Sequence, residues 1–224
     1  MTKNNANRTI LITGASGGLG SAVALACAAK GAQLVLMGRK ARPLEQLCDQ
    51  VEALGAPAPG YCALDLTKAG PAEIEELING LVEAYGGIFG LVHCAARFEG
   101  LRPFEQVQPM DWLLDLQVNT NAAWLITRTC LPSLRKSGGT IVFFEDRNAV
   151  GDAYWGGYGV AKAATSALAD MLAEELEDGP CNVLKLSPGP MRTGLRAAAY
   201  LAEDPNTVPE PTEVAQQVAK ALLD

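Results

Sequence analysis

The stretch TGASGGLG, residues Thr13–Gly20, decides the fold because it joins a short β-branched run to an Ala- and Leu-rich segment. Glycine at a strand-to-helix junction permits a tight turn, and the missing Cβ lets the backbone approach a pyrophosphate. The N–H groups that open the helix can then bind that anion. The stretch lacks the Lys-Ser/Thr ending of a P-loop, so it predicts a dinucleotide site rather than a nucleoside triphosphate site.

Strand-like and helix-like segments alternate outward from this turn along the whole chain. We expect strands at 9–13, 33–37, 60–64, 88–94, 140–144 and 181–186, and helices up to 30 and over 42–54, 71–85, 110–134, 154–177 and 212–223. Apolar strands separated by helices predict an α/β domain with a parallel sheet covered on both faces. Right-handed crossovers make this sheet doubly wound, as in the Rossmann fold.

The chain length suits a single dinucleotide-binding domain over residues 1–224. Segment 188–211 holds five prolines and is the least regular part of the sequence. A connection of that length more often has a function than serves as filler, so we expect it to form a substrate lid. Its residues Arg192 and Arg196 could recognise an acidic substrate group or could be solvated surface residues.

The composition and charge of the chain exclude several classes of protein. Hydrophobic residues at 49% and charged residues at 19% indicate a folded domain. A net charge of −7 without a basic run argues against nucleic acid or a membrane surface as partner. Apolar runs are too short for a membrane span, and residues 1–8 lack a signal-peptide centre, so we expect a cytoplasmic protein. Scattered cysteines and a single histidine predict no metal site.

The second predicted strand suggests which dinucleotide binds. Folds that bind NAD carry an acidic residue about 20 residues after the glycine turn, where it meets the ribose hydroxyls. Here the end of the strand reads Leu36-Met37-Gly38-Arg39-Lys40, with Arg39 in place of an acid. An arginine can hold a 2′-phosphate with two parallel hydrogen bonds, which predicts NADP(H). The alternative is that Arg39 is only a solvated residue at a strand end.

Further segments follow the glycine turn in a characteristic order: Asp65-Leu66, His93–Ala96, Val118-Asn119, Tyr158–Lys162 and Ser187–Gly189. Together with Thr13–Gly20 they make the sequence similar to the short-chain dehydrogenase/reductase family across essentially the whole chain. Within that family it resembles the YciK-like bacterial oxidoreductases, on account of the segments 38–39, 155–158 and 188–196.

The resemblance implies catalytic roles for Tyr158, Lys162 and Asn119. Tyr158 would exchange a proton with the substrate oxygen, and Lys162 would favour its phenolate and hold the cofactor ribose. Asn119 would anchor a water relay to the lysine. The i, i+4 spacing of Tyr158 and Lys162 puts both on one helix face. An ordinary amphipathic helix pair has the same spacing, although the glycine turn makes that interpretation less attractive.

The resemblance also implies a set of cofactor-binding residues: Gly14, Ser16, Gly18, Leu19, Gly20, Arg39, Asp65, Leu66, Cys94, Ala95, Lys162, Pro188, Gly189 and Thr193. Asp65 would bond the adenine amino group, and its alternative role is that of a turn or helix-capping carboxylate. Thr193 would contact the nicotinamide amide or the pyrophosphate. Tyr154 and Trp155 are candidates for the pocket wall, with buried packing as the competing role.

One departure from the family bears on catalysis. The family's catalytic serine is missing, and Asp146 falls at or within one residue of its place. An ionised aspartate cannot donate a hydrogen bond, and its charge raises the pKa of a nearby tyrosine. In one hypothesis Asp146 is protonated and donates as a carboxylic acid. In the other it pairs with Arg147 or a cationic substrate, and carbonyl chemistry is slow or absent.

Two further departures concern structure. The family's paired asparagines after the fourth strand are His93 and Cys94 here, and a strand-end position favours packing or cofactor contact over base chemistry for His93. The chain stops at Asp224, so the family's seventh strand is expected to be missing. The long helices 110–134 and 154–177 could still form a four-helix bundle across a dimer axis, which predicts a homodimer.

The resemblance therefore implies an NADP(H)-dependent oxidoreductase that moves hydride between nicotinamide and a small carbonyl or alcohol substrate. The alternative is a catalytically impaired NADP(H)-binding protein with a structural or redox-sensing role, because the serine is replaced. An isomerase or epimerase on the same fold remains a third possibility with no supporting residue.

Overall fold

The computed structural model describes residues 5–224 and contains one six-stranded sheet in the order β3-β2-β1-β4-β5-β6. All five strand pairs are parallel. The strands are β1 (Thr9–Thr13), β2 (Gln33–Gly38), β3 (Gly60–Ala63), β4 (Gly90–His93), β5 (Thr140–Phe144) and β6 (Asn182–Leu186). The predicted doubly wound Rossmann sheet is confirmed, and each strand boundary agrees with the sequence prediction within two residues.

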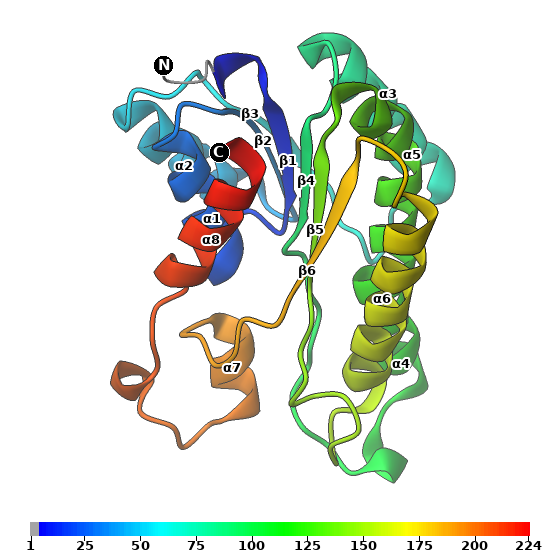
Figure 1. Ribbon diagram of the computed structural model, residues 1–224. Coiled ribbons are helices and arrows are strands. Elements are labelled where there is room, and N and C mark those ends of the chain that lie inside the picture. Colours follow the sequence, from blue (N-terminus) through cyan, green and yellow to red (C-terminus); the bar gives the residue numbers. More distant parts are fainter. Residues whose placement is uncertain (1–4) are drawn as a thin grey trace.

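Helices cover both faces of the sheet (Figure 1). One face carries α1 (Gly18–Ala28), α2 (Ala41–Ala53) and α8 (Thr212–Leu223). The other carries α3 (Pro71–Tyr85), α5 (Ala122–Ser137) and α6 (Gly156–Glu175). Each layer closes its own apolar core, in which β-strand residues such as Ile12 on the first face and Leu11 on the second are fully buried. Alternation along β1 therefore supplies both cores.

The switch point of the sheet lies at β1, which pairs with β2 on one side and β4 on the other. The chain moves outward in one direction through β2 and β3 and in the opposite direction through β4, β5 and β6. In doubly wound sheets the loops beyond the carboxyl ends of the strands separate at this point and leave a crevice for a ligand. The glycine turn after β1 lies in that crevice.

The predicted helix 110–134 is interrupted. The structure has α4 (Pro109–Leu116), a π-helical turn at Gln117–Asn121 and then α5, so one extra residue is inserted where Asn119 lies. Sequence periodicity did not predict this turn, because apolar spacing continues through it. Single π-helical turns inside helices are frequent at functional sites.

The other long helix begins later than predicted. Tyr154 was expected to open it, but its φ of 75° is left-handed, and α6 starts at Gly156. A tyrosine in this conformation is uncommon and cannot belong to a right-handed helix. Segment 188–211 was expected to be irregular, yet it contains α7 (Gly194–Ala199) and a short 3₁₀ turn, Pro205–Thr207. Figure 1 shows α7 beyond the carboxyl edge of the sheet.

Short 3₁₀ turns at Asn5–Asn7 and Phe104–Gln106 complete the regular structure of the described residues. Within residues 5–224, no helix is both long and apolar enough to cross a membrane.

The glycine turn gives a test of the packing at the switch point. Gly14 has a φ of +62°, and a Cβ there would lie 2.6 Å from the backbone of Ala95. Gly31 has a φ of +75°, and a Cβ there would meet nothing within 4 Å, so it is a matched control. We expect Gly31→Ala to lower the free energy of unfolding by about 1 kcal/mol, the left-handed strain alone. Gly14→Ala should lower it by at least about 3 kcal/mol, measured by urea unfolding. Equal losses would contradict the close approach.

Candidate active site

A cavity of about 640 Å³ opens at the carboxyl edge of the sheet, within the usual size of a cofactor pocket. It brings together these predicted site residues: Gly14, Ser16, Gly18, Leu19, Gly20, Arg39, Asp65, Leu66, Cys94, Ala95, Asp146, Tyr158, Lys162, Pro188, Gly189 and Thr193. Of the predicted catalytic and cofactor-binding residues, Asn119 alone does not line it, and of the two candidates for the pocket wall Trp155 lines it and Tyr154 does not. Parallel strands all end at this edge, which explains why residues so distant in sequence share one cavity.

The glycine turn is closed by a hydrogen bond within its own backbone. The N–H of Gly17 donates to the carbonyl of Gly14 at 2.9 Å, and Gly17 caps α1 without any side-chain hydrogen bond. The first N–H groups of α1 therefore have no side chain competing for them and are available to an anion. A Cβ at Gly18 would lie 3.2 Å from the Thr193 methyl group, so segment 188–211 packs directly on the turn.

The two residues expected at the adenosine end differ in their contacts. Arg39 is exposed and makes no salt bridge to any carboxylate of the described residues. The Asp65 carboxylate accepts hydrogen bonds from the N–H and hydroxyl of Thr67, at 3.1 and 2.7 Å, and these bonds lower its pKa. This is the turn role that was the alternative for Asp65. Its contact with adenine stays a prediction.

Tyr158 and Asp146 meet at the other end of the cavity. The Tyr158 hydroxyl donates to Oδ2 of Asp146 at 3.0 Å. Tyr158 is 2% exposed, and burial together with the Asp146 charge raises the pKa of Tyr158 well above its ordinary value. Both causes disfavour the phenolate. The tyrosine therefore keeps its proton at neutral pH.

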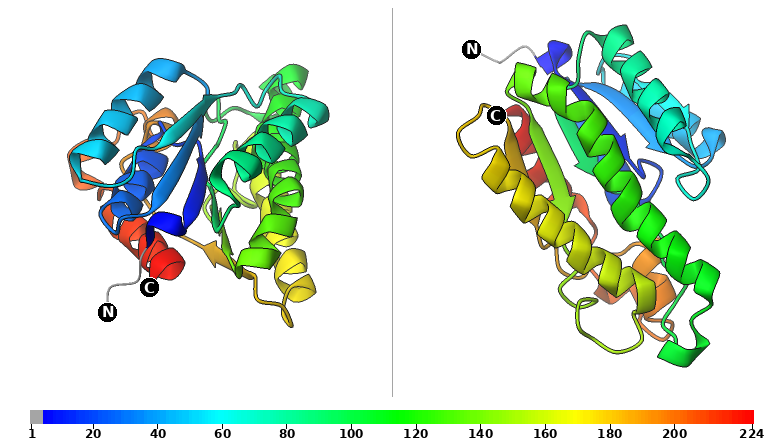
Figure 2. Two further views of the ribbon diagram at one scale, coloured as in Figure 1. Left: turned by 90° about the horizontal axis from the view of Figure 1, so that it is seen from above. Right: turned by 90° about the vertical axis from the view of Figure 1, so that its right-hand side faces the viewer.

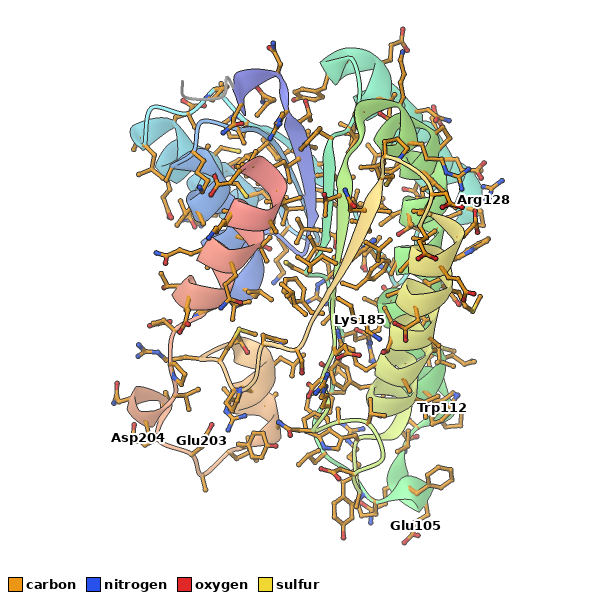
Figure 3. All side chains as sticks on the ribbon, viewed as in Figure 1. Glu105, Trp112, Arg128, Lys185, Glu203 and Asp204 are labelled. Carbon is orange, nitrogen blue, oxygen red and sulfur yellow. The ribbon has the colours of Figure 1, made fainter. Side chains whose placement is uncertain are left out.

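The structure also shows which of the two adjacent acidic residues meets Tyr158. Glu145 faces away from Tyr158: its carboxylate accepts from the Ser166 hydroxyl at 2.7 Å and lies 3.2 Å from the Lys185 ammonium. Lys185 reaches it from β6, near α6 (Figure 3). Arg147 pairs with Glu145 at 3.3 Å. The hypothesis that Asp146 pairs with Arg147 is therefore wrong, because the neighbouring glutamate takes that cation.

Lys162 is fixed one turn after Tyr158 on α6. Its ammonium donates to the backbone carbonyl of Phe144 at 3.0 Å and lies 5.8 Å from the centre of the Tyr158 ring. Burial lowers its pKa, and the Asp146 charge opposes that change. The expected pairing of Tyr158 and Lys162 on one helix face is present, and the lysine is anchored to the end of β5.

Asn119 lies in the π-helical turn and holds the chain after β4. Its side-chain oxygen accepts from the N–H of Arg97 at 3.0 Å, and its amide donates to the carbonyls of Arg97 and Asp115 at 2.9 and 2.8 Å. Its own backbone carbonyl accepts from the Thr165 hydroxyl at 2.8 Å. Asn119 thus links α4, α6 and the strand end. Its support of a water relay to Lys162 stays a prediction.

His93 is a packing residue. Its ring stacks on Phe143 with centroids 4.8 Å apart, and its Nε2 lies 2.8 Å from the Thr127 hydroxyl. Burial lowers the pKa of His93 to about 3, so the ring is neutral under ordinary conditions.

Cys94, in the place of the family's second asparagine, still ties β4 to β1 by its backbone N–H, which donates to the carbonyl of Thr13 at 3.2 Å. Burial raises the thiol pKa of Cys94.

Arg97 lines the cavity and was not predicted. Its guanidinium bonds Asp111 at 2.7 Å and Asp115 at 2.5 Å, two carboxylates one turn apart on α4. Those bonds and the Glu99 charge keep the arginine ionised in a partly buried place. The signal was present in the sequence as an arginine just past β4 with aspartates at i, i+4 spacing.

Segment 188–211 packs on the site through apolar and aromatic residues. Ala199 belongs to a small buried cluster with Ala149, Trp155 and Tyr158. Trp155 and Tyr200 line the cavity, with ring centroids 6.4 Å apart. Figure 3 shows Glu203 on this segment, where both oxygens of its carboxylate accept from Arg196 at 2.6 Å.

The pairing with Glu203 changes the expectation for the two arginines of segment 188–211. Arg196 is held within the segment and also covers the Tyr200 ring at 4.4 Å. Arg192 pairs with Glu210. Neither arginine offers an uncompensated charge, so the expectation that they bind an acidic substrate group is not supported.

The glycine turn, the cavity and the tyrosine–lysine pair on one helix define a nucleotide-binding oxidoreductase. The family model for short chain dehydrogenases matches residues 8–204, and the chain belongs to that family. Among curated relatives, the uncharacterized oxidoreductase YciK of Escherichia coli K12 is 32% identical over 93% of this chain and 83% of its own.

Solved structures agree with that assignment. The oxidoreductase YciK from E. coli superposes with a TM-score of 0.91 at 30% identity, covering 98% of this chain and 90% of that one. A Shigella flexneri 2a short chain dehydrogenase in complex with NADP gives 0.94 at 30% identity over 100% and 94%. An E. coli CFT073 counterpart in complex with NADPH gives 0.93 at 31% identity over the same shares.

The lowered pKa of His93 predicts a pH dependence of stability. Its folded pKa of about 3 lies below the ordinary value of 6.5, so the unfolded chain binds the extra proton first. The associated stability is fully present above pH 6.5 and is lost as the pH falls toward 3. We expect the free energy of unfolding to fall between pH 6.5 and 5 with a slope of up to about 1.4 kcal/mol per pH unit.

The control is His93→Asn, which restores the residue type that the family has at that place. Urea unfolding of this variant should show a flatter pH dependence over the same range, because histidine is the side chain that ordinarily titrates there. Equal slopes in the two proteins would contradict the buried neutral state of His93. Since the sequence has one histidine, its imidazole NMR signals can be followed directly.

Proposed function

We propose that this protein is an NADP(H)-dependent oxidoreductase. The observation that carries the proposal is the cavity that runs from Arg39 past the glycine turn to Tyr158 and Lys162. It offers a cation for a 2′-phosphate, uncapped N–H groups for a pyrophosphate and a proton-bearing phenol at the opposite end. The relatives solved with NADP and NADPH support the same cofactor.

The residues of the site fit that cofactor sterically. Gly14 and Gly18 have no Cβ to meet Ala95 or Thr193, so the turn packs closely on both segments and presents bare backbone to the cavity that it lines. Bound NADP(H) supplies the hydride or accepts it. Lys162, anchored on the Phe144 carbonyl, is placed to hold ribose hydroxyls, and segment 188–211 serves as a lid that packs on the turn through Thr193.

Tyr158 supports the reductive direction. A phenol whose pKa is raised by burial and by Asp146 holds its proton, whereas alcohol oxidation needs a phenolate to act as base. The family resemblance implies a small carbonyl or alcohol as substrate. With the proton retained, reduction of a small unsaturated substrate is the reaction that the site favours.

A second candidate function follows from the same hydrogen bond. The Tyr158 hydroxyl donates its hydrogen bond to Asp146, so this hydroxyl is not available to donate to a substrate oxygen. This favours an NADP(H)-binding protein without carbonyl turnover, which would use cofactor occupancy structurally or as a redox signal. Both candidates require cofactor binding, and they separate on hydride transfer.

Titration of the purified protein with NADPH and with NADH, followed by nicotinamide fluorescence, tests the cofactor. We expect tighter binding of NADPH, and Arg39→Ala should weaken NADPH by about 10–100-fold, the value of a charge-assisted phosphate contact. NADH is the internal control, because it lacks the 2′-phosphate and should be little affected. Absence of binding for both nucleotides would overturn the proposed function, and equal loss for both would remove the role of Arg39.

We also propose that the protein is a homodimer built on α4, α5 and α6. Large apolar side chains are exposed on these helices: Met110, Leu113, Trp124, Val160 and Met171. Figure 2 shows α5 and α6 side by side on one face of the molecule. An apolar face of this extent is typical of a surface that a partner covers, and two helices from each copy make a four-helix bundle.

Trp124→Glu tests this arrangement, because a charge buried in an apolar interface is desolvated without a partner. Trp124 is 50% exposed, and Leu54, at the end of α2 and 52% exposed, is a matched control outside that face. Sedimentation should show a dimer for the native protein and for Leu54→Glu but a monomer for Trp124→Glu. A monomeric native protein, or dissociation by both changes, would contradict the proposal.

A further inference from the structure

The arginines at the substrate end of the cavity are already paired with carboxylates. Arg97 bonds Asp111 and Asp115, and Arg196 bonds both oxygens of Glu203. Arg147 pairs with Glu145 at 3.3 Å. Each arginine that lines this end therefore has a carboxylate of its own. The substrate end differs in this respect from the adenosine end, where Arg39 makes no salt bridge to any described residue.

Asp146 is a carboxylate at this end of the cavity that pairs with none of these arginines. Its Oδ2 accepts the Tyr158 hydroxyl, and among residues 5–224 no lysine or arginine nitrogen lies within salt-bridge distance of it. The Lys162 ammonium, on which the Asp146 charge acts, donates to the Phe144 carbonyl instead. No described side chain bonds Oδ1 of Asp146. The carboxylate thus reaches the cavity with one oxygen engaged by a neutral phenol and without a salt bridge, while the charges of Lys162 and Arg196 act on it from a greater distance.

A neutral carbonyl is poorly matched to this place. A carbonyl oxygen and an ionised carboxylate both only accept hydrogen bonds, and the Tyr158 hydroxyl already donates to Asp146. A cationic N–H group is the complementary partner, since it donates a charge-assisted bond to Asp146. Trp155 lines the same cavity and gives it an aromatic wall, whereas the Tyr200 ring is already covered by Arg196 at 4.4 Å.

We propose that the substrate is a protonated imine, whose N–H donates to Asp146 and whose carbon receives hydride from NADPH. The proposal rests on the proposed oxidoreductase function. The imine carbon is reduced, the electron pair of the C=N bond becomes the nitrogen lone pair, and NADPH is oxidised to NADP⁺. The nitrogen already carries its proton, so Tyr158 loses none in this step. The amine that forms takes its next proton from water.

The binding test uses the protein saturated with NADPH and a pair of ligands of the same shape. Tetrahydroisoquinoline is a cation at neutral pH, and isochroman is its neutral oxygen counterpart. Calorimetry should show the cation binding at least about tenfold more tightly. Asp146→Asn should abolish that preference. Asp152→Asn, an exposed aspartate of the same loop that does not line the cavity, should keep it.

The turnover test follows NADPH absorbance with 3,4-dihydroisoquinoline and with the ketone of matching shape, 1-tetralone. We expect kcat/KM to be at least about tenfold higher for the imine, and we expect Asp146→Asn to remove the difference. A preference for the ketone, or a cation preference that survives Asp146→Asn, would overturn the proposed substrate class. NADPH affinity, measured separately in each protein, distinguishes these results from failure of the proposed function, which would show as no cofactor binding.

Discussion

The structure depends on how closely the end of β1 approaches the end of β4. Thr13 binds the backbone of both Cys94 and Ala95, through its carbonyl and its hydroxyl at 3.2 Å each. Gly14 follows at once, with its Cα so near Ala95 that a side chain has no space. Because this contact lies at the switch point of the sheet, beside the crevice, it sets the position of the glycine turn relative to the residues after β4.

The two ends of the cavity differ in whether their arginines are paired with carboxylates. At the adenosine end Arg39 is exposed and makes no salt bridge to any described carboxylate, whereas at the other end each lining arginine is neutralised by an acid of its own. The remaining charges there are Asp146 and the anchored Lys162. An acidic chain can bind an anionic cofactor in this way, because the favourable cation is local while the net charge of −7 is spread over the surface.

Much of the architecture could be predicted because the spacing of apolar residues and the positions of glycine turns are local properties of the sequence. Apolar runs between glycine turns indicate buried parallel strands, and parallel strands bring their carboxyl ends to one edge. Three features could not be predicted in this way. The π-helical turn at Asn119 leaves the apolar spacing intact, the left-handed Tyr154 has no glycine to mark it, and the compensation of Arg196 by Glu203 depends on how segment 188–211 folds back.

The choice between Glu145 and Asp146 shows why the site chemistry depends on the folded structure. The two acids are adjacent, so their side chains leave the end of β5 in different directions, and sequence spacing alone does not separate them. Lys185 and Ser166 hold Glu145 on the α6 side, which leaves Asp146 to meet Tyr158. The tyrosine, the residue on which the family's chemistry depends, therefore has a carboxylate as its hydrogen-bond partner. Its proton is held more firmly than beside a serine, and the site is better suited to a substrate that brings its own positive charge.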